Sequence, residues 1–331
     1  MTRVQAAVLA SLALAGAVAA QDQPIRIAVL NDQSSVYADF QGRGSVLAAQ
    51  MAVEDYGAKA AGRRIEVVFA DHQNKPDVGS GVARKWLDQD GVDLIVDIPN
   101  SAVALAVNEI VRQKNKVLIG SGAGSAELTG SKCSPNTVHW TYDTWSYGHS
   151  LAKAVVQRGG RTWFFITADY AFGHDLERQA TDQVVKDGGK VLGGVRTPIA
   201  TPDFSSFLLA AQSSGAQVVA LAVAGGDTTN SMKQAAEFGL PAKQSIVALI
   251  FGINNVPALG LKASQGALTV NPFYWDMDEG TRAWSRSFRK RAHNGAMPND
   301  MQAGVYASVL HFLKAVDKAG ARVTARRWWR R

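Results

Sequence analysis

Short apolar runs alternate with amphipathic stretches through the first half of the chain. The apolar runs are rich in Val, Ile and Leu, which is typical of β-strands, and the amphipathic stretches repeat their apolar residues at helical spacing. The expected strands are 25–30, 65–69, 94–98 and 117–120, and the expected helices are 44–56, 78–88 and 101–113. Because each run is apolar throughout, we expect it to be buried on both faces, as in a parallel sheet flanked by helices.

The same alternation starts again after an irregular segment, residues 130–144, that is rich in Ser, Pro, Asn and aromatic residues. The expected helices are then 145–158, 173–187, 204–214 and 228–238, and the expected strands are 162–167, 190–195, 218–223 and 245–250. After 254–260 a strand at 267–271 precedes helices at 279–291 and 301–318. The chain is therefore predicted to be α/β, with two Rossmann-like βα lobes that each contain a parallel sheet.

The first residues differ from this pattern. Arg3 is followed by an apolar run of small residues that extends to Ala20. This arrangement is typical of a secretory signal peptide, so we interpret residues 1–20 as a signal with cleavage near Ala20. A membrane anchor is the alternative, but the run is short and rich in Ala for a bilayer span. The residue directly after the expected cleavage point is Gln21 rather than Cys, which argues against lipid anchoring. We therefore expect export to the periplasm.

The net charge of the chain is weaker evidence for an acidic partner than its total suggests. The net charge is +7, which could indicate an acidic partner such as nucleic acid or a membrane surface. Five of the positive residues, however, lie among the last ten: Arg322, Arg326, Arg327, Arg330 and Arg331. Residues 321–331 form an atypical basic and aromatic tail, which could bind nucleic acid or an anionic membrane. We interpret it instead as a frame error or an early stop, and expect no nucleic-acid partner.

Cys133 is the only cysteine, so no disulfide within the chain is expected. Its neighbours Gly130 to Pro135 are typical of a surface turn, and no base can be assigned to the thiol. A nucleophilic role is therefore not expected.

Ligands of open parallel sheets bind beyond the carboxyl ends of the strands, so the loops that follow the strands are the candidate site. Several of these loops combine Gly, Ser, Thr or Asn with a helix start, which offers free backbone amides to an anion or is simply an N-cap. The aromatic residues Tyr37, Tyr170 and Phe172 in the same loops favour a small-molecule cleft. Asp227 either receives a cationic group or hydroxyl, or caps the helix that follows it.

Motifs of common enzymes are not found in the sequence. It contains no nucleophile elbow and no phosphate-binding loop, and the glycines at 120–124 do not complete a dinucleotide fingerprint. The six histidines show no metal-ligand spacing. We therefore expect neither catalysis nor a metal or cofactor.

Five segments of the chain resemble a known family, the exported substrate-binding proteins of ABC transporters in the branch related to the leucine/isoleucine/valine-binding proteins. The segments are 70–77 (ADHQNKPD), 98–104 (IPNSAVA), 134–143 (SPNTVHWTYD), 167–174 (TADYAFGH) and 224–229 (AGGDTT). Together the matching stretches run from residue 25 to about residue 320.

The resemblance implies a type I periplasmic binding fold with two lobes joined by a crossover hinge. It assigns residues 21–140 and 255–320 to the N-terminal lobe and 141–254 to the C-terminal lobe. Family members continue beyond the last helix and complete the second lobe. The resemblance therefore implies that the second lobe is incomplete here, with unpaired edges and exposed apolar surface.

The resemblance also implies which residues meet a ligand. It assigns aromatic contacts to Tyr37 and Phe172, places Tyr142 at the first crossover, and gives the groups of 123–125 to a ligand carboxylate. The full set of expected ligand-binding residues is Tyr37, Asn100, Ser101, Ala123, Gly124, Ser125, Tyr142, Tyr170, Phe172, Asp227, Thr228 and Phe251. The loop 251–254 lacks the acid with which amino-acid binders meet an ammonium group, unless Asp227 replaces it.

These observations predict a periplasmic, monomeric receptor that binds a small organic acid, either an aromatic carboxylate or a compound like a branched-chain amino acid. It would deliver this ligand to the permease and ATPase subunits of an ABC importer. The alternatives are a cytoplasmic ligand-sensing regulator of the same fold, which the signal peptide disfavours, and an enzyme.

Overall fold

The apolar runs of the first half form a six-stranded sheet in the computed structural model, which describes residues 23–320. The strands are β1 (Ile25–Asn31), β2 (Lys59–Ala60), β3 (Arg63–Asp71), β4 (Val92–Asp97), β5 (Val117–Gly120) and β6 (Thr137–His139). Their order is β2-β3-β1-β4-β5-β6, and all neighbours are parallel except the β2–β3 hairpin. The expected signal peptide and basic tail lie outside the described residues.

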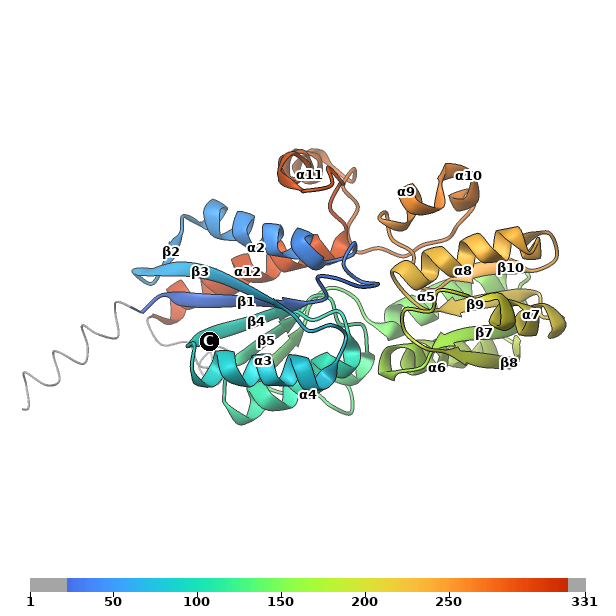
Figure 1. Cartoon of the computed structure of the whole chain (residues 1–331), viewed down its shortest axis with the longest axis horizontal. Helices are drawn as coiled ribbons and strands as arrows, with labels where there is room; N and C mark the ends of the chain where they lie inside the picture. The colour runs from blue at the N-terminus through green and yellow to red at the C-terminus, as the bar shows by residue number, and fades with distance from the viewer. Residues whose placement is uncertain (1–22, 321–331) are drawn as a thin grey trace, which may run out of the picture.

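Helices cover both faces of this first sheet (Figure 1). They are α2 (Gly42–Tyr56), α3 (Pro76–Asp88), α4 (Ser101–Gln113), α11 (Glu279–Arg291) and α12 (Asp300–Ala319). Ile27 and Val29 pack toward α2 and α12, whereas Ala28 and Leu30 pack toward α3 and α4. Alternate residues of β1 thus serve two cores, which is why the strand is apolar throughout.

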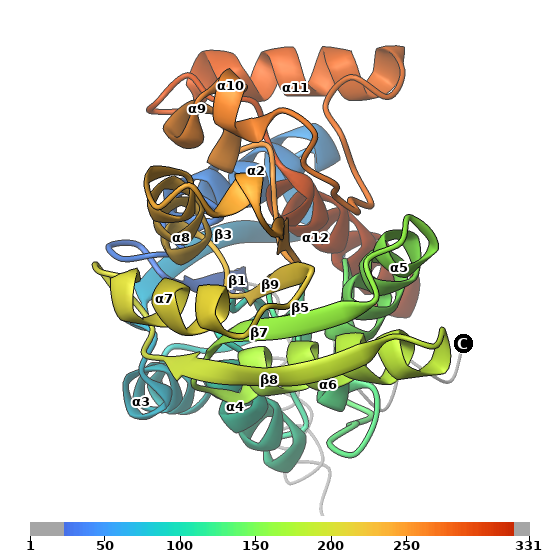
Figure 2. The ribbon, with the colours of Figure 1, turned by 90° about the vertical axis from the view of Figure 1, so that its right-hand side faces the viewer.

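The second half repeats this arrangement in a four-stranded, wholly parallel sheet with the order β10-β9-β7-β8. Its strands are β7 (Thr162–Ala168), β8 (Lys190–Thr197), β9 (Val218–Ala222) and β10 (Ser245–Ala248). The helices are α5 (Thr144–Gln157) and α6 (Ala171–Lys186) on one face, and α7 (Ser205–Ser213) and α8 (Gly226–Glu237) on the other. Figure 2 shows this lobe toward the viewer.

The chain crosses from the first lobe to the second between β6 and α5, and returns after α10 (Figure 1). Two short helices precede the return: α9 (Asn255–Leu259) and α10 (Leu261–Ser264). Their apolar side packs against α8, and Leu259 is buried in the same cluster as Ala235. The structure thus places residues 255–264 beside the second lobe, whereas the sequence placed them with the first.

Two further expectations differ from the structure. The strand expected at 267–271 does not form, because this segment pairs with no strand; Leu268 and Val270 instead pack against the core of the second lobe. The segment expected to be irregular, 130–144, contains β6, whose three residues pair with the end of β5. It also contains Cys133, which is exposed. Within residues 23–320, no helix is long and apolar enough to cross a membrane.

Candidate functional site

Loops that follow strands of both sheets meet where the two lobes contact each other. The amide of Gly226 donates a hydrogen bond to the carbonyl of Val36 at 2.9 Å. The amide nitrogen of the Asn254 side chain donates to the carbonyl of Asp39 at 2.8 Å. A side chain at position 225 would collide with the first lobe, since a Cβ there would lie 2.2 Å from the Val36 carbonyl oxygen. The lobes are therefore in close contact at this edge.

A pair of tyrosines joins the lobes at this interface. The hydroxyl of Tyr37, in the loop after β1, lies 2.7 Å from the hydroxyl of Tyr170, at the start of α6. Asp32 holds the first loop by accepting the amide of Tyr37 at 2.9 Å. Burial tends to raise the pKa of Asp32, but hydrogen bonds from Ser35 and the loop amides keep it below its ordinary value. Burial raises the pKa of both tyrosines, so both hydroxyls stay protonated.

Gly124 lies beneath two aromatic rings. A Cβ at this position would be 2.8 Å from the ring of Phe172 and 3.3 Å from that of Tyr142. The hydroxyl of Tyr142 donates to the carbonyl of Gly122 at 2.9 Å, which fixes the ring over the loop. Within residues 23–320, the amides of Ala123 and Gly124 donate to no acceptor. Two free amides next to aromatic rings are suited to an anionic group on an otherwise apolar ligand.

The next residue of this loop is held from the other lobe by Asp175, which the sequence reasoning missed. One carboxylate oxygen of Asp175, on α6, accepts the hydroxyl of Ser125 at 3.1 Å and the amide of Ala126 at 2.8 Å. The same oxygen accepts the hydroxyl of Thr144. Burial tends to raise the pKa of Asp175, but these hydrogen bonds lower it overall, so the group is a carboxylate at neutral pH. An acid in a helix sequence gives no sign of this role, because solvated acids have the same pattern.

Asn100 and Ser101, which follow β4, lie next to the loop that contains Gly124 and Ser125. The side-chain oxygen of Asn100 accepts the amides of Ala102 at 3.0 Å and Val103 at 3.1 Å, so it is the N-cap of α4. The hydroxyl of Ser101 accepts the amide of Ser125 at 3.1 Å. Both side chains are buried.

Asp227 is buried beside the tyrosine pair. One of its carboxylate oxygens accepts the amide of Ala200 at 3.0 Å, and the other has no hydrogen-bond partner among residues 23–320. The N-cap of α8 is Gly225, so Asp227 does not cap that helix. Burial raises the pKa of Asp227 to about 6. Its charge also contributes to the raised pKa of Tyr37, after burial and Tyr170.

The last two expected residues face the interior of the second lobe. The hydroxyl of Thr228 lies within hydrogen-bond distance of the carbonyls of Val223 at 3.2 Å and Ile250 at 3.3 Å, and so links the ends of β9 and β10. Phe251 packs in the core cluster that also contains Phe204. The structure therefore brings together a smaller set, which we call the interlobe site: Tyr37, Ala123, Gly124, Tyr142, Tyr170, Phe172 and Asp227.

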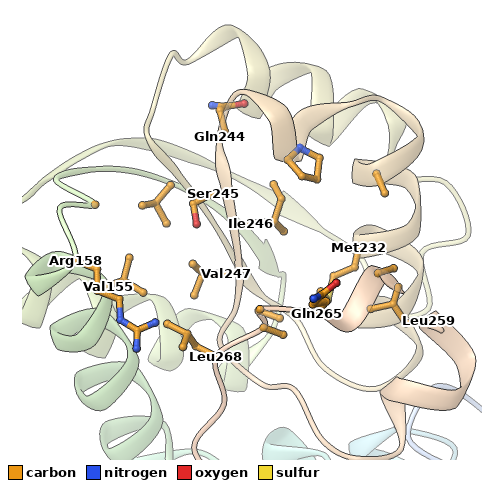
Figure 3. A pocket seen from close by; sticks show the side chains of 18 of the residues that line it. Val155, Arg158, Met232, Gln244, Ser245, Ile246, Val247, Leu259, Gln265 and Leu268 are labelled. Atoms are coloured by element: carbon orange, nitrogen blue, oxygen red, sulfur yellow. The ribbon is translucent and has the colours of Figure 1, made fainter. Parts of the chain in front are cut away.

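A large cavity lies elsewhere in the molecule. Its volume is about 1120 Å³, and it lies along β10 in the second lobe (Figure 3). None of the expected ligand-binding residues lines it. Within residues 23–320, no three His, Cys, Asp or Glu side chains gather as metal ligands would.

The chain is similar to known proteins over nearly all its length. The family described as periplasmic binding protein matches residues 24–327. The Leu/Ile/Val-binding protein homolog 6 of Brucella melitensis is 26% identical, and the match covers 98% of this chain and 84% of that protein.

Solved structures of periplasmic binding proteins are also similar to this chain. A periplasmic binding protein from Burkholderia mallei is 46% identical with a TM-score of 0.89, covering 92% of this chain and 80% of that one. A branched-chain amino acid ABC transporter periplasmic ligand-binding protein from Burkholderia xenovorans is 39% identical with a TM-score of 0.77, with the same coverage of 92% and 80%. A solute-binding protein of Rhodopseudomonas palustris in complex with 4-hydroxybenzoate is 22% identical, with a TM-score of 0.85 and coverage of 92% and 84%. The expected two-lobed α/β fold with parallel sheets is confirmed.

Proposed function

The chain belongs to the periplasmic binding protein family, and from this membership we propose that it is an exported receptor for a small organic acid. It takes up the acid between its lobes and presents the closed form to the permease and ATPase subunits of an ABC importer. Its relatives are solute-binding proteins of such transporters, which supports a periplasmic location and a role in binding rather than catalysis. The resemblance of the sequence segments had implied the same family, and the match confirms it.

The observation that carries the proposal is the pair of free amides, Ala123 and Gly124, under the rings of Tyr142 and Phe172. Backbone amides bind a carboxylate without adding a charge, and the rings cover the apolar part of the same molecule. An aromatic or branched aliphatic acid has this combination of groups. The 4-hydroxybenzoate bound by the Rhodopseudomonas neighbour supports the aromatic class.

Asp227 narrows the ligand further. A buried carboxylate oxygen without a partner is costly, and a hydroxyl or ammonium group on the ligand would offset that cost by donating a hydrogen bond. A hydroxylated aromatic acid places such a donor far from its carboxylate, whereas an α-amino acid places it adjacent. Hydroxylated aromatic acids and α-amino acids both carry such a donor, so the proposal includes both classes. The two classes predict different orders of affinity among the acids tested.

The test is a thermal-shift titration of the protein from Gln21 onward against benzoate, 4-hydroxybenzoate, leucine and isovalerate. A ligand at about 100 times its Kd stabilises the native state by about 2.7 kcal/mol, so one class should raise the melting temperature in proportion to log concentration. Benzamide and leucinamide, which lack the carboxylate, are the matched controls and should give no shift. A cooperative transition that none of these acids moves would contradict the proposal.

A further inference from the structure

Three successive carbonyl groups in the loop after β5 are each held by a hydrogen bond. All three partners belong to residues 139–144, which run from the end of β6 into the start of α5. The contacts are those of Gly122 with the hydroxyl of Tyr142 at 2.9 Å, Ala123 with Nε2 of His139 at 2.6 Å, and Gly124 with the amide of Thr144 at 2.7 Å. One short segment therefore fixes the carbonyl side of this loop.

These carbonyl contacts determine where the neighbouring amides point. No peptide bond among residues 23–320 is cis, and the C=O and N–H of a trans peptide point in opposite directions. Ser125 is an example, because its amide donates to the hydroxyl of Ser101 at 3.1 Å while the carbonyl of the same peptide accepts the amide of Thr144. By the same geometry, the bond to His139 turns the amide of Gly124 away from the imidazole ring. One carbonyl contact thus sets the direction of one of the two amides of the interlobe site.

The peptide between Ala123 and Gly124 needs such an anchor because one of its residues is glycine. Glycine adopts positive φ about as readily as negative φ, so this peptide can turn over at little steric cost. A reversed peptide would point the carbonyl of Ala123, instead of the amide of Gly124, at a bound carboxylate, and the oxygens of the two groups would repel each other. The hydrogen bond from His139 opposes this reversal.

His139 is the donor in its contact with Ala123, because a carbonyl oxygen only accepts, so Nε2 carries a proton. Burial lowers the pKa of His139 although its hydrogen bond and two nearby acids, Asp143 and Asp175, favour the charged form. The ring is therefore neutral at neutral pH. β6 pairs His139 with Gly120 of β5, which keeps the ring at the end of the strand from which the loop leaves. The ring thus acts as a neutral hydrogen-bond donor that is fixed next to the loop.

We propose that His139 is a positioning residue of the interlobe site, which holds the carbonyl of Ala123 so that the amide of Gly124 faces the carboxylate of the ligand. The proposal rests on the proposed function, because it takes the ligand to be an acid that these amides bind. His139 acts through the peptide that it holds and does not itself contact the ligand. Its donor group, and not its charge or bulk, is therefore the property that the site requires.

Two substitutions separate the donor from the rest of the side chain. The carboxamide nitrogen of His139→Gln replaces Nε2 as a donor, whereas His139→Met has a similar length and no donor. Residual dipolar couplings of the ligand-free, ¹⁵N-labelled protein from Gln21 onward measure the direction of the Gly124 N–H bond. We expect His139→Met to change this coupling and His139→Gln to keep it near the parent value. His139→Asn, whose amide is too short to reach Ala123, should behave like His139→Met and covers the case in which the methionine variant does not fold.

Calorimetric titration with benzoate, 4-hydroxybenzoate, leucine and isovalerate then measures what this direction contributes to binding. Hydrogen bonds to a charged group are among the strong ones, so His139→Met should weaken binding of the acid about tenfold or more, and His139→Gln should stay within about threefold of the parent protein. The matched control is His149→Met. His149 also bonds through a ring nitrogen to a carbonyl, that of Trp145 in its own helix at 2.9 Å, and its substitution should change neither measurement.

An unchanged Gly124 coupling in His139→Met would overturn the proposal, because the amide would keep its direction without the ring. A changed coupling with unchanged affinity would also overturn it, because the direction of the amide would then not matter for the acid. A merely structural role would lower the free energy of unfolding of His139→Met but leave both measurements on the folded protein at the parent values. If the parent protein binds none of the acids, the proposed function fails. The couplings need no ligand, so they still decide whether His139 orients the amide.

Discussion

Asp97 ends β4 with its carboxyl group fully buried and its backbone at a φ of 82°. The side-chain amide of Asn31 donates to one of its oxygens at 2.9 Å, and the other oxygen has no partner among the described residues. Burial outweighs the hydrogen bonds and raises the pKa of Asp97 from its ordinary value of 3.8 to about 7. The folded protein therefore holds this proton more tightly than the unfolded chain does.

The sign of the pH dependence follows from this. Where the native state binds more protons than the unfolded state, stability increases as the pH falls. Between about pH 8 and about pH 6.5, protonation of Asp97 should increase the free energy of unfolding by about 1 kcal/mol. Asp227 and Asp300, whose pKa values burial raises to about 6, act in the same direction at lower pH. Urea unfolding at the two pH values measures this effect.

The control variant is Asp97→Asn, which keeps the shape without the charge and tolerates a left-handed backbone. From the higher to the lower pH, its free energy of unfolding should gain about 1 kcal/mol less than that of the parent protein. A variant with an undiminished pH dependence would show that another group is responsible. His72 and His139 act in the opposite direction within the same pH range, because burial lowers the pKa of both, that of His72 to about 4, and the unfolded chain binds their protons first. The contribution of Asp97 is therefore read as the difference between the parent protein and the variant.

Gly124 gives a second prediction at the scale of one residue. A methyl group at this position would lie 2.8 Å from the Phe172 ring, so Gly124→Ala should displace the ring and weaken binding of the acid at least tenfold. The control is Gly81→Ala in α3, where an added Cβ meets no atom within 4 Å. Calorimetric titration of both variants compares the affinities. Equal affinities would place the ligand away from Gly124.

At the scale of secondary-structure elements, the side chain of Asn100 stabilises the start of a helix. It is the N-cap of α4, and loss of such a cap typically costs about 1 kcal/mol. Asn100→Ala should therefore lower the stability of the protein by about that amount, measured by urea unfolding. Asn100→Asp, which caps equally well, should restore it. Stability unchanged in the alanine variant, with lost ligand affinity, would instead indicate a direct ligand contact.

The sequence predicted most elements because the buried strands and amphipathic helices have strong patterns. The helix at 101–113 and the strand at 117–120 agree with α4 and β5 at both ends. The prediction of a strand at 267–271 was wrong. The apolar residues of this segment pack against the core of the second lobe, and an apolar pattern alone does not distinguish such packing from strand pairing. β6 was missed because three residues are too few to give a pattern.

For the whole molecule, Asp175 is the side chain that holds the lobes together at Ser125 and Ala126. Hydrogen bonds to a charged group are worth about 1.5–3 kcal/mol, so Asp175→Ala should shift the equilibrium toward an open form by roughly tenfold or more. Small-angle X-ray scattering should show a larger radius of gyration without ligand, and the ligand should bind more weakly.

The matched control is Arg178→Ala, which removes a half-exposed partner of Asp175 but leaves the contacts with the first lobe. It should scatter like the parent protein. If both variants scattered like the parent, Asp175 would not control closure.

The interlobe site was predicted in part because its residues follow strands, and parallel sheets bring the ends of their strands together. This reasoning assigned Tyr37 and Tyr170 to one cleft, and the structure brings their hydroxyls into contact although the two residues are 133 apart in the sequence. Position after a strand could not distinguish residues of the interlobe site from residues that only support the neighbouring loops. Thr228 and Phe251 follow strands equally well, yet the Thr228 hydroxyl bonds to a carbonyl of the second lobe and Phe251 packs in that lobe's core.

The exposed Cys133 gives the molecule a practical property. It lies on the first lobe between the 3₁₀ turn Ala126–Leu128 and β6, and it is the only thiol in the chain. A maleimide dye or a gold electrode would therefore attach at one defined position, without any mutagenesis. If the lobes close on a solute as proposed, the second lobe moves relative to that position, and a labelled sample would act as a reagentless optical or electrochemical sensor for the solute.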